Sequence, residues 1–114
     1  MREIVKLFKA LSDPNRIRIL KMLELRPLCV CEITEVLQLA TSTVSKHLSI
    51  LRDVDLIIDN KEGKWVNYKL NMSGRGINAK ELLVLIGTSL NDDRVICADF
   101  RRVKEVDRNT ICQS

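Results

Sequence analysis

The sequence lacks the features of several protein classes. No apolar run reaches about 18 residues, so we expect no membrane-spanning helix and no membrane partner. The charged N-terminus has no apolar signal-peptide core, which predicts a cytoplasmic protein. The chain has one histidine, no glycine-rich phosphate loop and no pairing of a nucleophile with a base, so it is predicted not to be an enzyme.

The composition is that of one folded domain. The chain has 114 residues, of which 46% are hydrophobic and 30% are charged, so it can bury a core and is too apolar to be disordered. The net charge of +4 favours a polyanionic partner. Residues 1–26 carry seven cationic side chains against three acidic ones, whereas residues 91–114 carry five of each. The C-terminal tail is therefore not a basic arm.

Two of the four cysteines, Cys29 and Cys31, lie close together in the sequence. Thiols stay reduced in the cytoplasm, so such a pair indicates metal or redox chemistry more than a structural disulfide. Thiolates are soft ligands and favour soft metals and metalloids. Inert packing and a redox switch are the alternative interpretations, although a disulfide between cysteines so close together is strained.

Apolar spacing predicts a first helix over residues 2–10 and a second over residues 14–25. Asp13 is placed to be the N-cap of the second helix. Pro14 suits its first position, because proline lacks only an N–H that has no partner there. Three cations of this helix are expected on its solvent-facing sides, Arg16, Arg18 and Lys21.

Two short helices are predicted after Pro27, over residues 29–37 and 41–53, with a tight turn between them. The later helix is rich in Ser, Thr, Lys and His. This is the pattern of a helix-turn-helix, in which the second helix enters the major groove of DNA. Because Ala40 is a poor N-cap, Thr41 is expected to cap the second helix.

A β-hairpin is predicted next, from residues 56–58 and 65–70 around a polar loop. One face of its second strand, with Val66, Tyr68 and Leu70, is expected to be buried. A helix-turn-helix followed by such a hairpin is a winged helix.

The predicted contacts with double-stranded DNA come from the second helix of this motif and from the hairpin. Hydroxyl groups and lysines there suit phosphates and base edges. For the single histidine we favour packing or a phosphate contact over base reading. The residues are Thr41, Ser42, Thr43, Ser45, Lys46, His47, Arg52, Lys61 and Lys64.

A helix over residues 78–90 is apolar nearly all round, so we expect a partner subunit to cover it. The predicted homodimer face combines the first and fifth helices, and it includes Leu7, Leu82, Leu85 and Ile86. A sixth helix, capped by Asn91 or Asp92, is expected to follow.

The predicted fold is mostly α with a small β-hairpin. It is a winged helix-turn-helix with α-helical dimerisation elements at both ends. Residues 1–92 form the DNA-binding domain, and residues 93–114 form a C-terminal helix and tail.

Four stretches, residues 8–16, 28–32, 43–48 and 63–68, resemble the ArsR/SmtB family of metal-sensing winged-helix repressors. The Cys-Val-Cys-Glu box at residues 29–32 resembles the thiolate-sensing branch of that family, which responds to arsenite, antimonite, cadmium or lead. The resemblance implies a homodimer that represses an arsenical-resistance operon. It further implies that the protein binds operator DNA without a cofactor and leaves it when As(III) or Sb(III) binds Cys29 and Cys31.

Three departures from the family pattern narrow the choice of metal. Thr34 stands where arsenite sensors carry a third cysteine, so Cys112 or Cys97 is the candidate third ligand. No cysteine precedes the first helix, which argues against cadmium, and no histidine lies in the fifth helix, which argues against zinc. Two alternatives stay open: a sensor of organic trivalent arsenicals, which needs only two thiols, and a winged-helix regulator whose cysteines are not a metal site.

The spacing of the cysteine pair also predicts a mechanism. On an ideal helix Cys29 and Cys31 point about 200° apart, so both sulfurs can bind one ion only if the first helical turn is unwound or absent. The helix N-terminus is expected to favour the thiolate form. Metalloid binding is then expected to distort this turn, shift the DNA-reading helix and weaken DNA binding by about 5- to 150-fold.

Overall fold

The computed structural model describes residues 1–73 and 79–111. The elements in chain order are α1 (Arg2–Leu11), α2 (Pro14–Leu23), β1 (Leu28–Cys29), α3 (Val30–Leu37), α4 (Thr41–Asp53), β2 (Ile57–Glu62), β3 (Trp65–Leu70), α5 (Ala79–Gly87), α6 (Arg94–Glu105) and α7 (Arg108–Ile111). The strands form one antiparallel sheet in the order β1–β3–β2. Among the described residues, no helix is long and apolar enough to cross a bilayer. The predicted winged helix-turn-helix is confirmed.

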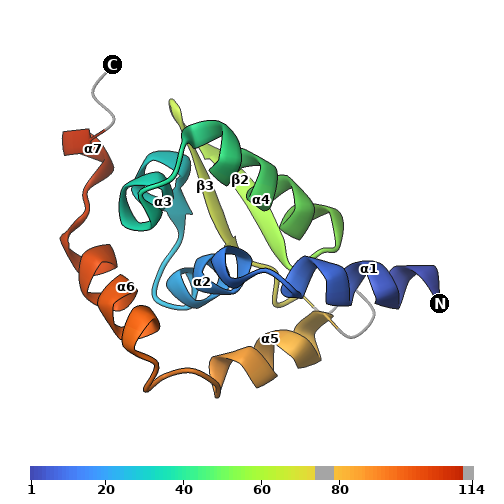
Figure 1. Cartoon of the computed structure of the whole chain (residues 1–114). Coiled ribbons are helices and arrows are strands. Elements are labelled where there is room, and N and C mark those ends of the chain that lie inside the picture. The colour runs from blue at the N-terminus through green and yellow to red at the C-terminus, as the bar shows by residue number, and fades with distance from the viewer. Residues whose placement is uncertain (74–78, 112–114) are drawn as a thin grey trace.

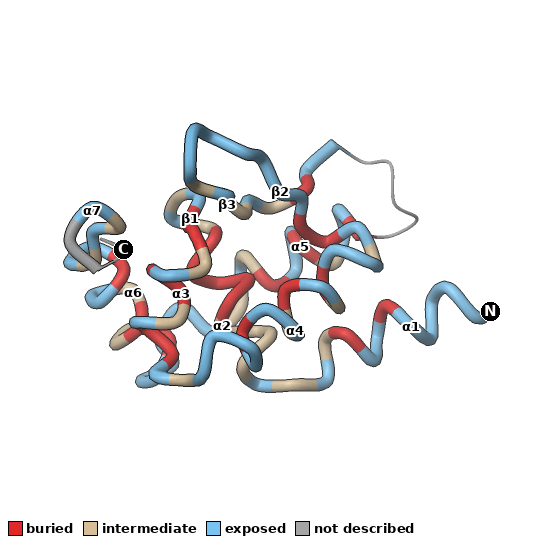
Figure 2. The backbone as a smooth tube through the Cα atoms, turned by 90° about the horizontal axis from the view of Figure 1, so that it is seen from above, coloured by how far each residue is buried: buried red, intermediate tan, exposed pale blue. Residues whose placement is uncertain are grey.

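The helices surround α2, which lies near the centre of the molecule (Figure 1). The helix-turn-helix pair α3 and α4 packs on one side of α2, next to the sheet, and α5 and α6 pass along the other side. α1 extends away from the body, with the N-terminus at its far end. Figure 2 shows that the buried segments gather around α2 and α3, whereas the tip of the β2–β3 hairpin is exposed.

α2 begins where the sequence predicts. Asp13 has an extended backbone, and its carboxylate accepts hydrogen bonds from the N–H groups of Asn15 and Arg16 at 2.7 and 3.3 Å. These bonds satisfy N–H groups that have no partner within the helix. The apolar side of α2 then forms the centre of the core, with Ile19, Leu20 and Met22 fully buried.

Lys21 is fully buried, so its predicted place on a solvent-facing side is wrong. Its ammonium donates to the carbonyl oxygen of Ile86 at 3.0 Å and to the side-chain oxygen of Asn91 at 2.9 Å. Arg18 also has a partner in α6, since two of its guanidinium nitrogens donate hydrogen bonds to the Asp99 carboxylate at 2.9 and 3.0 Å. These polar contacts attach the α5–α6 corner to α2, and they satisfy cations that burial would otherwise penalise.

The turn between α3 and α4 depends on Gln38, which adopts the left-handed conformation with φ 57° and ψ 43°. Its backbone N–H donates to the carbonyl oxygen of Thr34 at 2.9 Å and ends α3. α4 has the predicted bounds, but its N-cap is Ala40 without a side-chain hydrogen bond, so the prediction that Thr41 caps it is wrong. The inward side of α4 is formed by Val44, Leu48 and Leu51.

The hairpin closes through the two-residue loop Gly63-Lys64. Gly63 has φ 60° whereas Lys64 has no positive φ, which is the pattern of a type II′ turn. Tyr68 and Leu70 pack partly buried against the core, but Val66 is 37% exposed. The predicted burial of this whole face is therefore wrong for Val66, which lies near the tip of the hairpin.

α1 and α5 expose apolar side chains, as expected of helices that need a partner. These are Ile4, Val5 and Phe8 of α1 and Val84 and Leu85 of α5. Of the predicted dimer residues, Leu85 is exposed, whereas Leu7 and Ile86 belong to the core of their own subunit. α6 begins at Arg94 with Asp93 as its N-cap, so the predicted caps Asn91 and Asp92 are wrong by one or two positions.

Candidate cysteine site and nucleic-acid interface

The cysteine pair lies at the junction between a strand and a helix. Cys29 ends β1, where it pairs with Asn67 of β3, and its extended backbone (φ −88°, ψ 167°) makes it the N-cap of α3. Cys31 lies in the first turn of α3. The predicted helix includes Cys29, and β1 is absent from the elements predicted from the sequence. The two residues therefore differ in backbone conformation, since Cys29 is extended and Cys31 is helical.

The Cys29 side chain is buried, with 3% of its surface exposed. Burial raises the pKa of the Cys29 thiol above its usual value, and the hydrogen bond from the Glu32 N–H offsets this only in part. The expectation that the helix N-terminus favours the thiolate is thus wrong for Cys29, because desolvation opposes charge more strongly.

Glu32 closes the first turn of α3. Its Oε1 accepts a hydrogen bond from the backbone N–H of Cys29 at 3.0 Å, and the pair forms a capping box. Its Oε2 lies 3.0 Å from Nη1 of Arg26, in the loop between α2 and β1. Glu32 is almost fully buried, so this ion pair compensates for the loss of solvation of its carboxylate.

The four cysteines do not form a metal site in the described part of the chain. Cys31 is disulfide-bonded, contrary to the predicted reduced state, whereas Cys29 and Cys97 are free. The Cys97 thiol donates to the carbonyl oxygen of Asn91 at 3.2 Å. Cys112 lies outside the described residues. In residues 1–73 and 79–111, no three side chains of His, Cys, Asp or Glu gather into a possible metal site. Cys97 therefore does not join Cys29 and Cys31 in a group of possible metal ligands.

The predicted DNA-binding residues of α4 share one surface. Thr41, Ser42, Thr43, Ser45 and Lys46 are all exposed, whereas the apolar residues of the same helix face the core. Helical periodicity explains this separation, since positions three and four apart lie on one side. The arrangement can present hydroxyl and ammonium groups to a polyanion.

His47 lies at the border of this surface, beside a cation from α2. Nη1 of Arg16 is 3.2 Å from Nδ1 of His47. The two residues line an open pocket of about 510 Å³ with Ser42, Thr43, Lys46 and Ile50. Arg16 was not among the predicted site residues. The net positive charge of this pocket suits a phosphate.

The other predicted DNA-binding residues are placed apart from that pocket. Arg52 lies at the end of α4 and pairs with Asp59 of β2 at 3.1 Å, so its charge is partly neutralised. Lys61 and Lys64 are exposed at the hairpin tip, where the Lys64 ammonium lies 4.8 Å from the centre of the Trp65 ring. The hairpin therefore offers two exposed cations at its tip.

Three arginines near the candidate sites are not among the site residues predicted from the sequence, namely Arg16, Arg26 and Arg108. Each contacts an element that is distant in sequence, so no local pattern reveals its role. The cationic excess of residues 1–26 was the one available signal for the first two.

Known proteins share both this sequence pattern and this arrangement. The family described as "Bacterial regulatory protein, arsR family" matches residues 13–59. The arsenical resistance operon repressor of Escherichia coli (strain K12) is 43% identical over 68 residues, which are 59% of this chain and 58% of that protein. The chain thus spans less than two thirds of that relative. The repressor of the same name from Bacillus subtilis (strain 168) is 38% identical over 72 residues, which are 62% of this chain and 69% of that protein.

Solved structures also match. HlyU from Vibrio cholerae N16961 superimposes with a TM-score of 0.63 and 33% sequence identity, over 75% of this chain and 88% of that chain. The match to the family model covers α2, the helix-turn-helix and the start of the wing. From these matches and the winged helix-turn-helix itself, the chain belongs to the arsR family of bacterial regulatory proteins.

Proposed function

We propose that this protein is a homodimeric transcriptional repressor that leaves its operator when trivalent arsenic or antimony binds Cys29 and Cys31. The observation that carries the proposal is the place of Cys29, which caps the first helix of the helix-turn-helix. A ligand that moves this residue must disturb the support of the recognition helix, because α3 packs directly on α4. The proposed location is the cytoplasm.

The exposed hydroxyl groups and cations of α4 support DNA binding. We place α4 in the major groove, with Ser42, Thr43 and Lys46 at bases or phosphates and the wing lysines on the backbone. No cofactor is needed for these contacts. One such helix reads few base pairs, so two subunits and two half-sites about one helical turn apart are proposed.

The exposed apolar sides of α1 and α5 support the homodimer. Phe8 is 56% exposed and Leu85 is 60% exposed, which is costly for large apolar side chains that gather on two helices. A second copy of the chain covers such a surface in a symmetric pair.

The chemistry of the pair supports a thiophilic inducer. Arsenous acid condenses with two thiols, forming two As–S bonds and releasing two water molecules, and soft thiolates are preferred over imidazole or carboxylate. Both thiols must be reduced for this reaction. Since Cys29 is buried and hydrogen-bonded through its backbone to Glu32, we propose that binding opens the capping box. Organic trivalent arsenicals, which need two thiols only, fit the same pair.

A second candidate function is a redox response of the same DNA-binding unit. It is favoured by the disulfide at Cys31. In that case oxidation of Cys31, and not metalloid binding, changes the pose of α3.

The test uses reduced full-length protein and a duplex selected from a random pool by the protein itself. Fluorescence anisotropy measures DNA affinity with and without arsenite, antimonite, phenylarsine oxide or cadmium. The proposal expects release by a trivalent arsenical or antimonite, and loss of release with DNA binding kept in Cys29→Ser and Cys31→Ser. Cys97→Ser is the matched control and should respond like the wild type. Release that survives both substitutions rejects the metalloid site, and a response to oxidant alone favours the redox function.

A further inference from the structure

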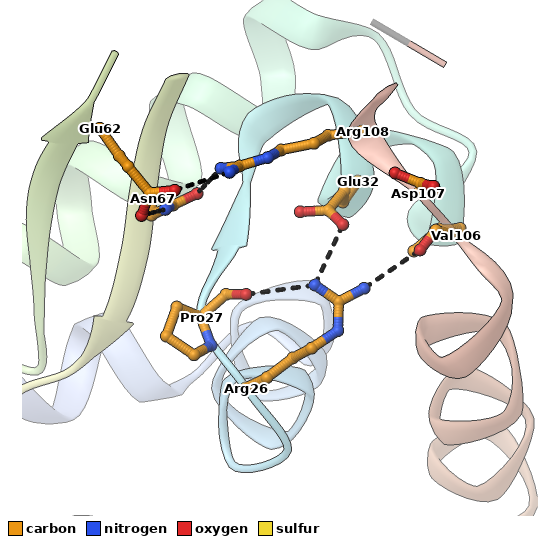
Figure 3. A pocket seen from close by; sticks show the side chains of 8 residues that line it. All are labelled: Arg26, Pro27, Glu32, Glu62, Asn67, Val106, Asp107 and Arg108. Atoms are coloured by element: carbon orange, nitrogen blue, oxygen red, sulfur yellow. Dashed lines mark hydrogen bonds and ion pairs between the residues drawn. The ribbon is translucent and has the colours of Figure 1, made fainter. Parts of the chain in front are cut away.

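A group of polar side chains lies between the wing, the start of α3 and the segment that follows α6 (Figure 3). They border an open pocket of about 380 Å³. We call this group the wing clasp; it consists of Arg26, Glu32, Glu62, Asn67 and Arg108.

Arg108, from α7, contacts both strands of the wing. Its Nη1 donates to Oδ1 of Asn67 in β3 at 3.0 Å, and its Nη2 donates to Oε1 of Glu62 in β2 at 2.7 Å. The guanidinium carbon lies 5.1 Å from the centre of the Trp65 ring, so the side chain also covers this aromatic face. One side chain from the C-terminal segment thus fixes the two strands relative to each other and to α7.

Arg26 forms the other half of the clasp. Besides its ion pair with Glu32, its Nη2 donates to the carbonyl oxygens of Val103 and Val106 at 3.1 Å each. These carbonyls lie at the C-terminal end of α6, where the helix leaves them without helical partners. The start of α3 is therefore attached to the chain just before Arg108.

The cysteine pair connects to the clasp at two points. The backbone of Cys29 pairs with Asn67, which contacts Arg108, and its N–H donates to Glu32, which contacts Arg26. Any displacement of Cys29 therefore acts on partners of both arginines. This route reaches the wing without passing through α4.

We propose that Arg108 is a positioning residue that couples occupancy of the cysteine pair to the wing. The inference rests on the proposed function and adds a second path by which the inducer weakens DNA binding. In the ligand-free protein Arg108 holds the wing in place and neutralises Glu62. When Cys29 moves toward a metalloid, Asn67 shifts with β1, Arg108 loses an acceptor and the wing is released.

Charge explains why release of the wing weakens DNA binding. Glu62 lies at the tip of the wing, between Lys61 and the Gly63-Lys64 turn, so its charge is close in the chain to both lysines proposed to contact DNA. With Arg108 bound its negative charge is offset, whereas without Arg108 it opposes the phosphates. The ion pair is exposed on the Glu62 side, so its contribution to folding is small and its effect is expected in DNA binding.

The test compares the wild type with Arg108→Ala, Arg108→Lys and the matched control Arg101→Ala, which removes an exposed arginine of α6. For each reduced protein, anisotropy gives the operator Kd with sodium arsenite and the Kd without it. The quantity compared is the first Kd divided by the second. Arg108→Ala is expected to reduce this ratio by roughly threefold or more, with Arg108→Lys in between and Arg101→Ala unchanged. The number of arsenite molecules bound per subunit should be the same in all four proteins.

Trp65 provides an independent readout, because it is the only tryptophan of the chain and lies against Arg108. Arsenite should change its emission in the wild type and in Arg101→Ala, but not in Arg108→Ala. An unchanged Kd ratio or an unchanged emission response in Arg108→Ala overturns the inference and leaves the proposed function standing. A wild-type protein that keeps its operator with arsenite bound overturns the proposed function and, with it, this inference.

Discussion

Nη1 of Arg16 lies 3.2 Å from Nδ1 of His47, and this contact joins α2 to the recognition helix. A guanidinium can only donate hydrogen bonds, so Nδ1 of His47 is the acceptor of this contact while the imidazole is neutral. Nε and Nη2 of Arg16 donate to the carbonyl oxygens of Ala10 and Lys9 at 2.7 and 3.1 Å. One side chain therefore fastens the C-terminal end of α1, α2 and α4 to one another, so it links the proposed dimer helix with the proposed DNA-reading helix.

Arg16→Ala is expected to lower the free energy of unfolding by about 2 kcal/mol, because it leaves two carbonyl groups and a ring nitrogen without their charged donor. Operator affinity should fall as well, since α4 loses its attachment to α2. Urea denaturation and anisotropy measure the two effects, with Arg101→Ala as the control. A variant with unchanged stability and affinity would show that Arg16 is dispensable for both.

The N-cap Asp13 should make stability depend on pH. Burial raises the pKa of the Asp13 carboxyl, but the N–H bonds from Asn15 and Arg16, with the nearby His47 and Arg16, outweigh it and lower the pKa below 3.8. The ionised cap therefore stabilises the fold above pH 3.8, and this stability is lost as the pH falls through the lower folded-state pKa.

The measurement for Asp13 is urea unfolding of the wild type, Asp13→Ala and Asp13→Asn. Asp13→Ala is expected to cost about 1 kcal/mol at neutral pH. Asp13→Asn keeps a capping oxygen that does not titrate, so the wild type should be more stable than this variant at neutral pH, and the difference should shrink below pH ~4. A difference that is constant with pH contradicts the assignment.

The Cys29 thiol should react slowly while the protein is folded. Its pKa lies above the usual 9.0 because the side chain is buried, and only the thiolate is alkylated. In reduced protein, mass spectrometry should find slower iodoacetamide labelling of Cys29 without urea than with it. The rate in urea should level off as the pH approaches about 9, whereas the folded rate continues to rise. Faster labelling in the folded protein at neutral pH would contradict this.

Phe8→Glu should convert the proposed dimer to monomer. Phe8 is exposed beside Ile4 and Val5 on α1, so a charge there opposes burial against a second copy while the subunit core is untouched. Analytical ultracentrifugation at micromolar concentration measures the change in mass. Leu25→Glu is the matched control, because Leu25 is similarly apolar and exposed but lies after α2, outside the proposed dimer helices. Dimers that persist in Phe8→Glu place the interface elsewhere.

Local signals were enough to predict the helix-turn-helix. The Asp13-Pro14 start of α2 and the bounds of α4 agree with the prediction, because capping and helical periodicity act within a few residues. The exposed apolar side of α5 was also foreseen, whereas Leu7, the residue predicted for the dimer side of α1, is buried. The cysteine pair was proposed as a site from its spacing, and that role stays a prediction.

Long-range contacts account for what was missed. β1 has only two residues and exists through its pairing with β3, so no local pattern predicts it. Lys21 is buried because its acceptors, Ile86 and Asn91, come from far along the chain. The Arg108 contacts with the wing have the same origin. Hydrophobic periodicity contains none of this information.

The position of Cys29 has a further consequence for how this protein can change. One residue completes the β1–β3 ladder, caps α3 and fills a place in the buried interior. Exchanging it for histidine or aspartate in order to attract a harder cation alters all three roles together. A substitution that changes which ion this site binds therefore also changes the local fold. Binding of a different ion is easier to obtain with ligand residues placed elsewhere on the chain.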